Sequence, residues 1–286
     1  MAGTQGAPKD IAVIVTGAAR GMGRAMTLAL ASAGVRVAAA DLASSRDAMR
    51  EVLDTARKQG VQDKIVPLEC DITRWQDCAA AVQTAADRFG AVHGLVNNAG
   101  IAVTDEELAS GRARRRRFYE HDADGWRRVI DTNVNGSFQM AKAIAPALIA
   151  QGWGRIVIVT TSYTTMQLDG FSPYGPSKAA LEAATVVWSK DLANTGVTVN
   201  ALVPGGAGNT RMVPHDEMPD RSKLVQPDVM MAPIVWLMSG ASDGVTGQRF
   251  VASQWDPALA PRAAAEKAGA PAGFGAAVIA AQAQSA

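Results

Sequence analysis

Hydrophobic and polar positions along the chain follow two different periods. Short apolar runs are separated by longer stretches in which apolar residues recur at helical spacing. The apolar runs predict buried strands at 11–16, 35–41, 64–69, 94–97, 155–160 and 197–203. The intervening stretches predict helices at 22–33, 45–59, 74–89, 126–151 and 174–195.

This alternation of strands and helices predicts one α/β domain. Right-handed crossovers of this length place parallel strands in one sheet and helices on both of its faces, a doubly wound arrangement. The domain is expected to span 1–256, with an inserted charged connection at about 101–125. The tail at 257–286 is rich in Ala, Pro and Gly, and its sequence fits either partial disorder or an extra helix docked on a neighbouring surface.

Composition narrows the function classes. A formal net charge of +1 over 286 residues argues against a dedicated nucleic-acid or membrane-surface protein. The chain begins without a secretory signal pattern, and no apolar run approaches the ~20 residues that span a bilayer, so we expect a soluble, cytoplasmic protein. No metal site is predicted, because Cys70, Cys78, His93, His121 and His215 lack ligand spacing, and both cysteines read as buried, unreactive thiols.

A glycine-rich segment follows the first predicted strand. Gly17, Gly21 and Gly23 lie where this strand meets the first helix, together with Arg20 and Met22. Glycines in this context allow a tight turn, a close approach of a pyrophosphate to the backbone and close packing of the helix on the sheet. The segment therefore predicts a dinucleotide site in a Rossmann-like fold.

The second predicted strand ends at Asp41, followed by Leu42. A carboxylate at this point accepts hydrogen bonds from a ribose diol and repels a 2′-phosphate, which favours NAD over NADP. Arg20 and Arg46 are the counterargument, because either side chain could reach a 2′-phosphate.

Tyr174 and Lys178 lie four residues apart in a helix-forming run, which puts a phenol and an ammonium on one helix face. A nearby cation favours the phenolate, so we expect Lys178 to lower the pKa of Tyr174 from its usual value of about 10. A tyrosine tuned in this way exchanges protons with an oxygen atom at neutral pH.

Six motifs in one order resemble the short-chain dehydrogenase/reductase family over residues 11–252. They are Thr16-Gly17-x3-Gly21-x-Gly23, Asp71-Ile72, Asn97-Asn98-Ala99-Gly100, Asn133 in Asn133-Val134-Asn135-Gly136, Tyr174-x3-Lys178 and Asn200-x3-Pro204-Gly205. The resemblance implies an NAD-dependent enzyme that interconverts a secondary alcohol and a ketone by hydride transfer. It also implies a homotetramer or homodimer packed through the helices at 126–151 and 174–195.

The resemblance further implies roles for individual residues. Tyr174 would be the general acid and base, Lys178 would hold the nicotinamide ribose, and Asn133 would hold a water that links Lys178 to solvent. Asn97 would brace the sheet. The remaining expected cofactor contacts are Asp71 and Ile72 at the adenine, Asn98, Ala99 and Gly100 along the ribose, and Pro204, Gly205 and Thr210 near the carboxamide.

One position departs from the family pattern. The family usually has serine thirteen residues before the tyrosine, where this chain has Thr161, and Ser162 follows. Adjacent strand residues point to opposite faces, so the two hydroxyls cannot exchange roles. Register favours Thr161, whereas a one-residue deletion in the following loop would favour Ser162, and both stay candidates to orient the substrate oxygen.

Several side chains could border a substrate. The arginine-rich insertion, with Arg112 and 114–117, and the adjacent Phe118 and Tyr119 either cap the pocket, which would suit an acidic substrate, or form a solvated loop. An apolar wall is expected from Met166, Leu168, Phe171, Met212 and Val213, and packing roles from Trp236 and Trp255.

Three alternative functions stay open. One is an NADP-dependent carbonyl reductase, and another is a dinucleotide-binding sensor or scaffold without turnover. A nucleic-acid binder built on the arginine run is the third, although the remaining charge forms no basic face.

Overall fold

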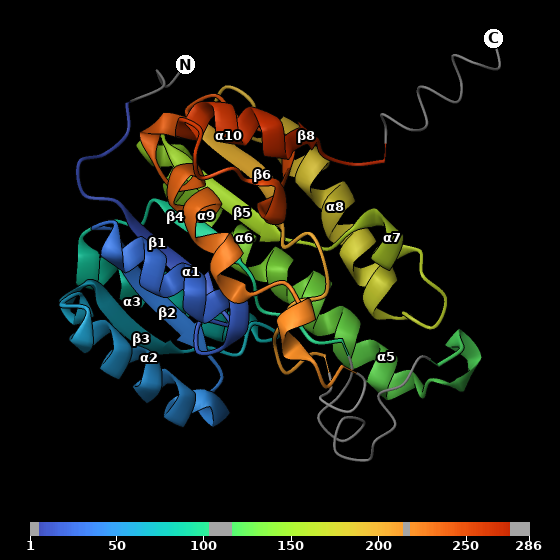
Figure 1. Ribbon diagram of the computed structural model, residues 1–286. Helices are drawn as coiled ribbons and strands as arrows, with labels where there is room; N and C mark the ends of the chain where they lie inside the picture. The colour runs from blue at the N-terminus through green and yellow to red at the C-terminus, as the bar shows by residue number, and fades with distance from the viewer. Residues whose placement is uncertain (1–5, 103–115, 214–217, 275–286) are drawn as a thin grey trace, which may run out of the picture.

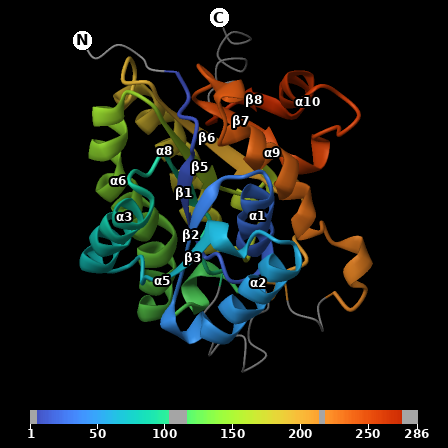
Figure 2. The same ribbon diagram turned by 90° about the vertical axis from the view of Figure 1, so that its left-hand side faces the viewer.

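A computed structural model of the chain describes residues 6–102, 116–213 and 218–274. One eight-stranded sheet, in the order β3-β2-β1-β4-β5-β6-β7-β8, lies between two layers of helices (Figures 1 and 2). The strands are β1 Ala12–Thr16, β2 Arg36–Asp41, β3 Ile65–Glu69, β4 Gly94–Asn97, β5 Gly154–Val159, β6 Val197–Val203, β7 Gln248–Val251 and β8 Gly269–Pro271. All neighbouring strands are parallel except β7 and β8, which are antiparallel.

The helices cover both faces of this sheet. They are α1 Gly21–Ser32, α2 Arg46–Lys58, α3 Trp75–Phe89, α5 Ala123–Ile130, α6 Ser137–Gln151, α7 Tyr163–Met166, α8 Tyr174–Asp191, α9 Met231–Leu237 and α10 Pro261–Ala268. Side chains of α1, α2 and α9 pack with Val13 and Val15 of β1, while those of α3, α6 and α8 pack with Ala12 and Ile14. Successive strand residues therefore serve two separate cores, as expected of a sheet buried on both faces.

The predicted fold class is confirmed, and so are the six predicted strands, each within one residue of its expected bounds. The helix expected at 126–151 is interrupted: α5 and α6 are joined by a π-helical turn, Asp131–Gly136. The pattern missed β7, β8, α7, α9 and α10. Each of them is eight residues or shorter, and α10 and β8 place part of the Ala- and Pro-rich tail against the sheet.

Some expectations fall outside the described ranges. They concern Arg112, Arg114, Arg115, His215 and residues 275–286. Among the helices that are described, none combines the length and the apolar character needed to cross a membrane.

Ile144 of α6 tests the packing of the core on this face. Ile144 is fully buried against the sheet, whereas Leu259, which lies before α10, is 40% exposed. Ile144→Ala is expected to lower the free energy of unfolding by about 2–5 kcal/mol, because it removes buried apolar contacts and leaves a cavity. Leu259→Ala is the control, with an expected loss below about 1 kcal/mol. Urea denaturation measures both, and equal losses would contradict the described packing.

Candidate active site

The glycine segment after β1 forms a cradle that larger residues would fill. Gly17 and Gly21 have φ angles of 63° and 51°, in the left-handed region that favours glycine. A Cβ atom at Gly23 would lie 2.0 Å from the carbonyl oxygen of Gly17, and one at Gly21 would lie 2.9 Å from Cγ2 of Thr210. The first amides of α1 follow this open backbone, an arrangement that suits a pyrophosphate.

Asp41 ends β2 beside this cradle. Its Oδ2 accepts a 2.9 Å hydrogen bond from the amide of Ala19, and its Oδ1 accepts a 2.8 Å bond from the amide of Leu42. These bonds hold the carboxylate at the mouth of the glycine segment, and each oxygen keeps a lone pair for a ribose hydroxyl.

The two arginines that could favour a 2′-phosphate have partners of their own. Arg20 donates a 2.9 Å hydrogen bond to the hydroxyl of Ser45. Arg46 forms a 2.5 Å ion pair with Glu69, and this hydrogen bond lowers the pKa of Glu69. A 2′-phosphate would have to compete with these contacts.

Thr16 joins the cradle to the segment after β4. Its Oγ1 accepts hydrogen bonds from the amides of Asn98 and Ala99, both 3.0 Å long. The side-chain amide of Asn98 donates in turn to the carbonyl oxygens of Thr16 and Gly17. This clasp fixes the Asn98–Gly100 backbone against the glycine segment. Asn97 braces the sheet as expected, with a 2.9 Å hydrogen bond to the carbonyl of Ser137 in the opposing helix layer.

A hollow of about 330 Å³ opens past the carboxyl ends of β2 and β3. Its lining residues are Leu42, Ala43, Ser44, Glu69, Cys70, Asp71, Arg74 and Asp77. Asp71, expected at the adenine, therefore lines this hollow and also accepts hydrogen bonds from the amide and hydroxyl of Thr73. Ile72 follows Asp71 and is buried, with its side chain packed against Gly136.

The loop after β6 faces the glycine segment from the opposite side. Gly205 has a φ of 97°, and Thr210 approaches Gly21 as described above. Arg221 holds this loop in place: its guanidinium donates to the side chain of Asn209 and to the carbonyl oxygens of Thr210 and Val213. Motif reading missed Arg221, and its only sequence signal is a basic residue shortly after the Pro204-Gly205 turn.

At the start of α8, Lys178 is buried and Tyr174 is partly buried. The amine of Lys178 donates a 2.9 Å hydrogen bond to the carbonyl of Val159 and lies 5.8 Å from the centroid of the Tyr174 ring. Burial lowers the pKa of Lys178 to about 8. Burial also raises the pKa of Tyr174 to about 12, so the expected lowering by Lys178 is wrong for this structure. Desolvation of the phenolate outweighs the attraction of the neighbouring amine.

The two candidate hydroxyls have different partners. The hydroxyl of Thr161 acts on Tyr174 and lowers the pKa of that tyrosine, against the larger effect of burial. Ser162 caps α7, because its Oγ accepts a 3.0 Å hydrogen bond from the amide of Thr165 and lies 2.7 Å from the Thr165 hydroxyl. The structure thus brings Thr161 to Tyr174 and commits Ser162 to a helix end.

Asn133 lies in the π-helical turn and is fully buried. Its Oδ1 accepts from the amide of Ile101, and its Nδ2 donates to the carbonyl of Ile101 and to the hydroxyl of Ser177, all at 2.8–2.9 Å. A Cβ atom at Gly100 would lie 3.0 Å from Oδ1 of Asn133 and 3.5 Å from the amine of Lys178. Asn133, Lys178 and the Gly100 backbone therefore converge. Ser177, which sequence reasoning missed, links this group to α8.

The residues expected around a substrate differ in their burial. Met166, the last residue of α7, is buried. Trp236 and Trp255, for which packing roles were expected, lie against each other with ring centroids 5.8 Å apart. Phe118 and Tyr119 are exposed and stack edge to face. At the start of that segment, Arg117 forms a 3.5 Å ion pair with Asp169. Leu168, Phe171, Met212 and Val213 are partly buried.

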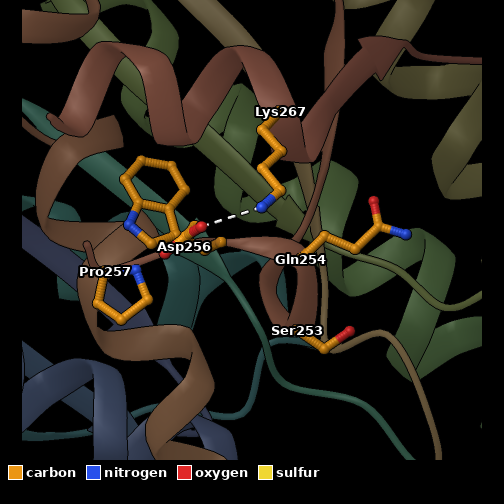
Figure 3. Close-up of a pocket in the computed structure, with 6 residues that line it drawn as sticks. Ser253, Gln254, Asp256, Pro257 and Lys267 are labelled. Carbon is orange, nitrogen blue, oxygen red and sulfur yellow. Dashed lines mark hydrogen bonds and ion pairs between the residues drawn. The ribbon is translucent and has the colours of Figure 1, made fainter. Parts of the chain in front are cut away.

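A second hollow, of about 500 Å³, lies beyond β7 and contains none of the predicted site residues (Figure 3). Its lining residues are Ser253, Gln254, Trp255, Asp256, Pro257 and Lys267. Lys267 of α10 forms a 2.9 Å ion pair with Asp256 across it. In the described ranges no three His, Cys, Asp or Glu side chains come together as metal ligands.

Comparisons with known proteins agree with this geometry. The family model for short chain dehydrogenases matches residues 11–219. A 3-oxoacyl-[acyl-carrier-protein] reductase of Synechocystis is 30% identical over 243 residues, covering 83% of this chain and 93% of the relative. A cyclohexanol dehydrogenase of Acinetobacter is 28% identical over 246 residues, covering 83% and 91%.

Solved structures show the same similarity. A crystal structure of a short-chain type dehydrogenase/reductase from Mycobacterium marinum superimposes with a TM-score of 0.72 at 27% sequence identity. The match covers 84% of this chain and 93% of that one.

The buried ammonium of Lys178 predicts a gain in stability when it is removed. Burial takes its pKa from 10.5 to about 8, so below pH 8 a charged group opposes folding. Lys178→Met is expected to raise the free energy of unfolding by about 1–3 kcal/mol at pH 7. Between pH 8 and 10.5 the unfolded state holds the extra proton, so the wild type grows more stable and the advantage of the variant shrinks.

Denaturant titrations across this pH range measure the effect. Lys190→Met is the matched control, since Lys190 lies exposed near the end of the same helix and is expected to change stability by less than about 0.5 kcal/mol. A destabilised Lys178→Met variant would contradict the described environment.

Proposed function

Because the chain belongs to the short-chain dehydrogenase/reductase family and is an oxidoreductase, we propose that it interconverts a secondary alcohol and a ketone with NAD as cofactor. The observation that carries this proposal is the position of Tyr174 one helical turn before the buried Lys178, whose amine lies 5.8 Å from the centroid of the tyrosine ring. The family resemblance supports the assignment of this tyrosine as the acid and base that serves the substrate oxygen.

The proposed chemistry at the substrate oxygen belongs to Tyr174 and Thr161. In ketone reduction, the phenol of Tyr174 donates its proton to the oxygen as negative charge develops there. The hydroxyl of Thr161 donates a second hydrogen bond to the same oxygen. In alcohol oxidation the phenolate accepts the proton. A raised tyrosine pKa keeps the phenol protonated at neutral pH, so it favours reduction there and favours oxidation as the pH rises.

The cradle after β1 fits a dinucleotide, because a Cβ at Gly23 would collide with the backbone and Asp41 is held at its mouth. When bound, the nicotinamide supplies or accepts the hydride. The residues proposed to hold the cofactor are Gly17, Arg20, Gly21, Met22, Gly23, Asp41, Leu42, Asp71, Ile72, Asn98, Ala99, Gly100, Tyr174, Lys178, Pro204, Gly205 and Thr210. Asn133 is proposed to keep Lys178 in place, and a water beside it stays a prediction.

The proposed substrate class also draws on the relatives. The names of the Synechocystis and Acinetobacter proteins speak of the reduction of a 3-oxo group and the dehydrogenation of cyclohexanol. An alcohol and a ketone exchange in both, which supports the same pair of functional groups here.

We also propose that the chain forms a homodimer or homotetramer through α5, α6 and α8. Apolar side chains stand exposed on all three helices, namely Trp126 on α5, Phe138 and Ile149 on α6 and Val187 on α8. Association would remove this apolar surface from water.

Removal of the Tyr174 hydroxyl tests the chemistry. Tyr174→Phe is expected to lower kcat by more than about 1000-fold on any alcohol or ketone that the wild type accepts, because no group replaces the proton donor. NAD affinity is expected to stay within about twofold, since the ring is retained. NADH absorbance and fluorescence titration measure the two quantities.

Tyr119→Phe is the control for this substitution, because Tyr119 is exposed and is not among the residues proposed for catalysis or cofactor binding, and we expect wild-type rates from it. A wild-type protein that binds NAD and turns over no member of a broad alcohol and ketone panel would favour the sensor or scaffold instead. Normal turnover by Tyr174→Phe would contradict the role of Tyr174.

Asp41 tests the cofactor preference. Asp41→Asn removes the charge that repels a 2′-phosphate and weakens the bonds to a ribose diol. NAD affinity is expected to fall about 10-fold and NADP affinity to rise about 10-fold, from the loss of one charged hydrogen-bond acceptor. Asp47→Asn, an exposed change in the first turn of α2, is expected to alter neither. A wild type that prefers NADP would instead support a phosphate contact by Arg20 or Arg46.

A further inference from the structure

An ion pair lies behind Thr161, in the interior of the protein. The side chain of Glu182 in α8 is 0% exposed, and that of Arg249 in β7 is 6% exposed. Nη1 of Arg249 donates a 2.8 Å hydrogen bond to Oε2 of Glu182. A buried pair of this kind adds little net stability compared with apolar residues of similar volume. Its presence so close to the proposed site therefore calls for a role other than stability.

Arg249 contacts the segment that carries the proposed catalytic hydroxyl. Its Nη2 donates a 2.8 Å hydrogen bond to the carbonyl oxygen of Thr161, and its Nη1 lies 3.2 Å from the hydroxyl oxygen of Thr160. The guanidinium also stacks 4.2 Å from the centroid of the Tyr163 ring. One planar cation thus restrains the chain on both sides of Thr161.

Glu182 connects the same segment to the helix that carries Tyr174. It follows Tyr174 by eight residues and Lys178 by four, so the three side chains share one face of α8. Its carboxylate accepts hydrogen bonds from the hydroxyls of Thr160 and Tyr163, at 3.0 and 3.1 Å. Burial and this carboxylate raise the pKa of Tyr163 to about 12, which keeps that phenol a donor.

The last described residues complete the network. The amide of Gly273 donates a 3.1 Å hydrogen bond to Glu182, and its carbonyl accepts a 2.9 Å bond from the Tyr163 hydroxyl. Phe274 packs on the Tyr163 ring, with centroids 5.4 Å apart. Gly273 and Phe274, which follow β8, therefore contact the Glu182 carboxylate and the Tyr163 ring.

We propose that Arg249 is a positioning residue for Thr161. It ties the backbone of Thr161 to Glu182, and so to the helix face that presents Tyr174 and Lys178. The distance between the two hydroxyls that would share a substrate oxygen is then set by this pair. This inference rests on the proposed function for its kinetic consequence, and its geometric part can be tested separately.

Arg249→Lys is the principal variant. A lysine keeps the charge opposite Glu182, but a single ammonium cannot provide the fork that also reaches the carbonyl of Thr161. The expected result is a fall in kcat of about 10- to 100-fold, the effect of a displaced catalytic group. NAD affinity is expected to stay within about twofold. The alkaline limb of the oxidation pH profile is expected to move upward, because Tyr174 loses the hydrogen bond that opposes its raised pKa.

Arg155→Lys is the matched control. Arg155 is also a buried arginine, with its side chain 2% exposed, and it pairs with Asp243 and stacks on Trp153. It belongs to the first residues of β5, at the opposite end of that strand from Thr161. The control is expected to lose stability while kcat and the pH profile stay at wild-type values. A similar loss of kcat in both variants would overturn the proposal.

A readout without turnover separates this proposal from the proposed function. The chain has only three tyrosines, so carbon-13 NMR of labelled tyrosine, assigned by Tyr119→Phe and Tyr174→Phe, resolves the Tyr174 ring. Thr161→Val defines the shift that follows loss of the Thr161 hydroxyl. Arg249→Lys is expected to move the Tyr174 signal in that direction and Arg155→Lys to leave it unchanged.

Turnover and the Tyr174 signal test different claims. A wild type without turnover on any substrate would refute the proposed function. A moved Tyr174 signal in Arg249→Lys would still support the positioning role in that case. An unmoved signal, or wild-type kcat, would overturn it. If Arg249→Lys does not fold, the double variant Glu182→Gln with Arg249→Met removes both charges together and undergoes the same measurements.

Discussion

Parallel strands that end together at one edge of the sheet are the constraint on which the site depends. Asp41 is the last residue of β2, and Asn98 follows β4 directly. Thr161 and Gly205 come two residues after the ends of β5 and β6. The register that pairs Thr16 with Ala40 and Asn97 with Ile158 brings these ends to one level. Residues far apart in sequence then meet without long loops, as ligands do at the carboxyl ends of open α/β sheets.

Hydrogen bonds around Thr16 hold the segment after β4 against the glycine segment at this edge of the sheet. One hydroxyl accepts two amides from the segment after β4, while the Asn98 side chain returns bonds to the backbone of the glycine segment. The glycines are required because the backbone itself occupies the space of a side chain. The same backbone atoms therefore stabilise the fold and line the proposed binding surface, so a substitution that displaces them affects both.

Much of this arrangement could be predicted from the sequence. The six predicted strands have short, mostly apolar runs, and their length and flanking turn residues distinguish them from buried helices. β7 was missed because its four residues, Gln248 to Val251, include Gln248 and Arg249, which break the apolar pattern. The π-helical turn was missed because the helix pattern continues through it, and only backbone geometry reveals the extra residue.

The site was predictable to the extent that motifs carry it. Tyr174, Lys178 and the glycines follow from spacing, but the choice between Thr161 and Ser162 depends on the hydrogen bonds that follow β5, which no spacing reveals. The direction of the pKa shift of Tyr174 could not be predicted for a related reason. The sequence shows that Lys178 is a neighbour, but it does not show the burial of the phenol, which is the largest cause of the shift. Glu182 and Arg249 lie 67 residues apart, so their pairing emerges only from the folded chain.

The two outer strands of the sheet have one residue type in common. β3 lies at one edge and contains Pro67, while β8 lies at the other and ends in Pro271. Proline has no amide hydrogen to offer a neighbouring strand, and β8 is only three residues long. Both borders of the sheet thus discourage the addition of a strand from another molecule, a route to aggregation that long, unprotected borders leave open. The helical faces carry no such restriction.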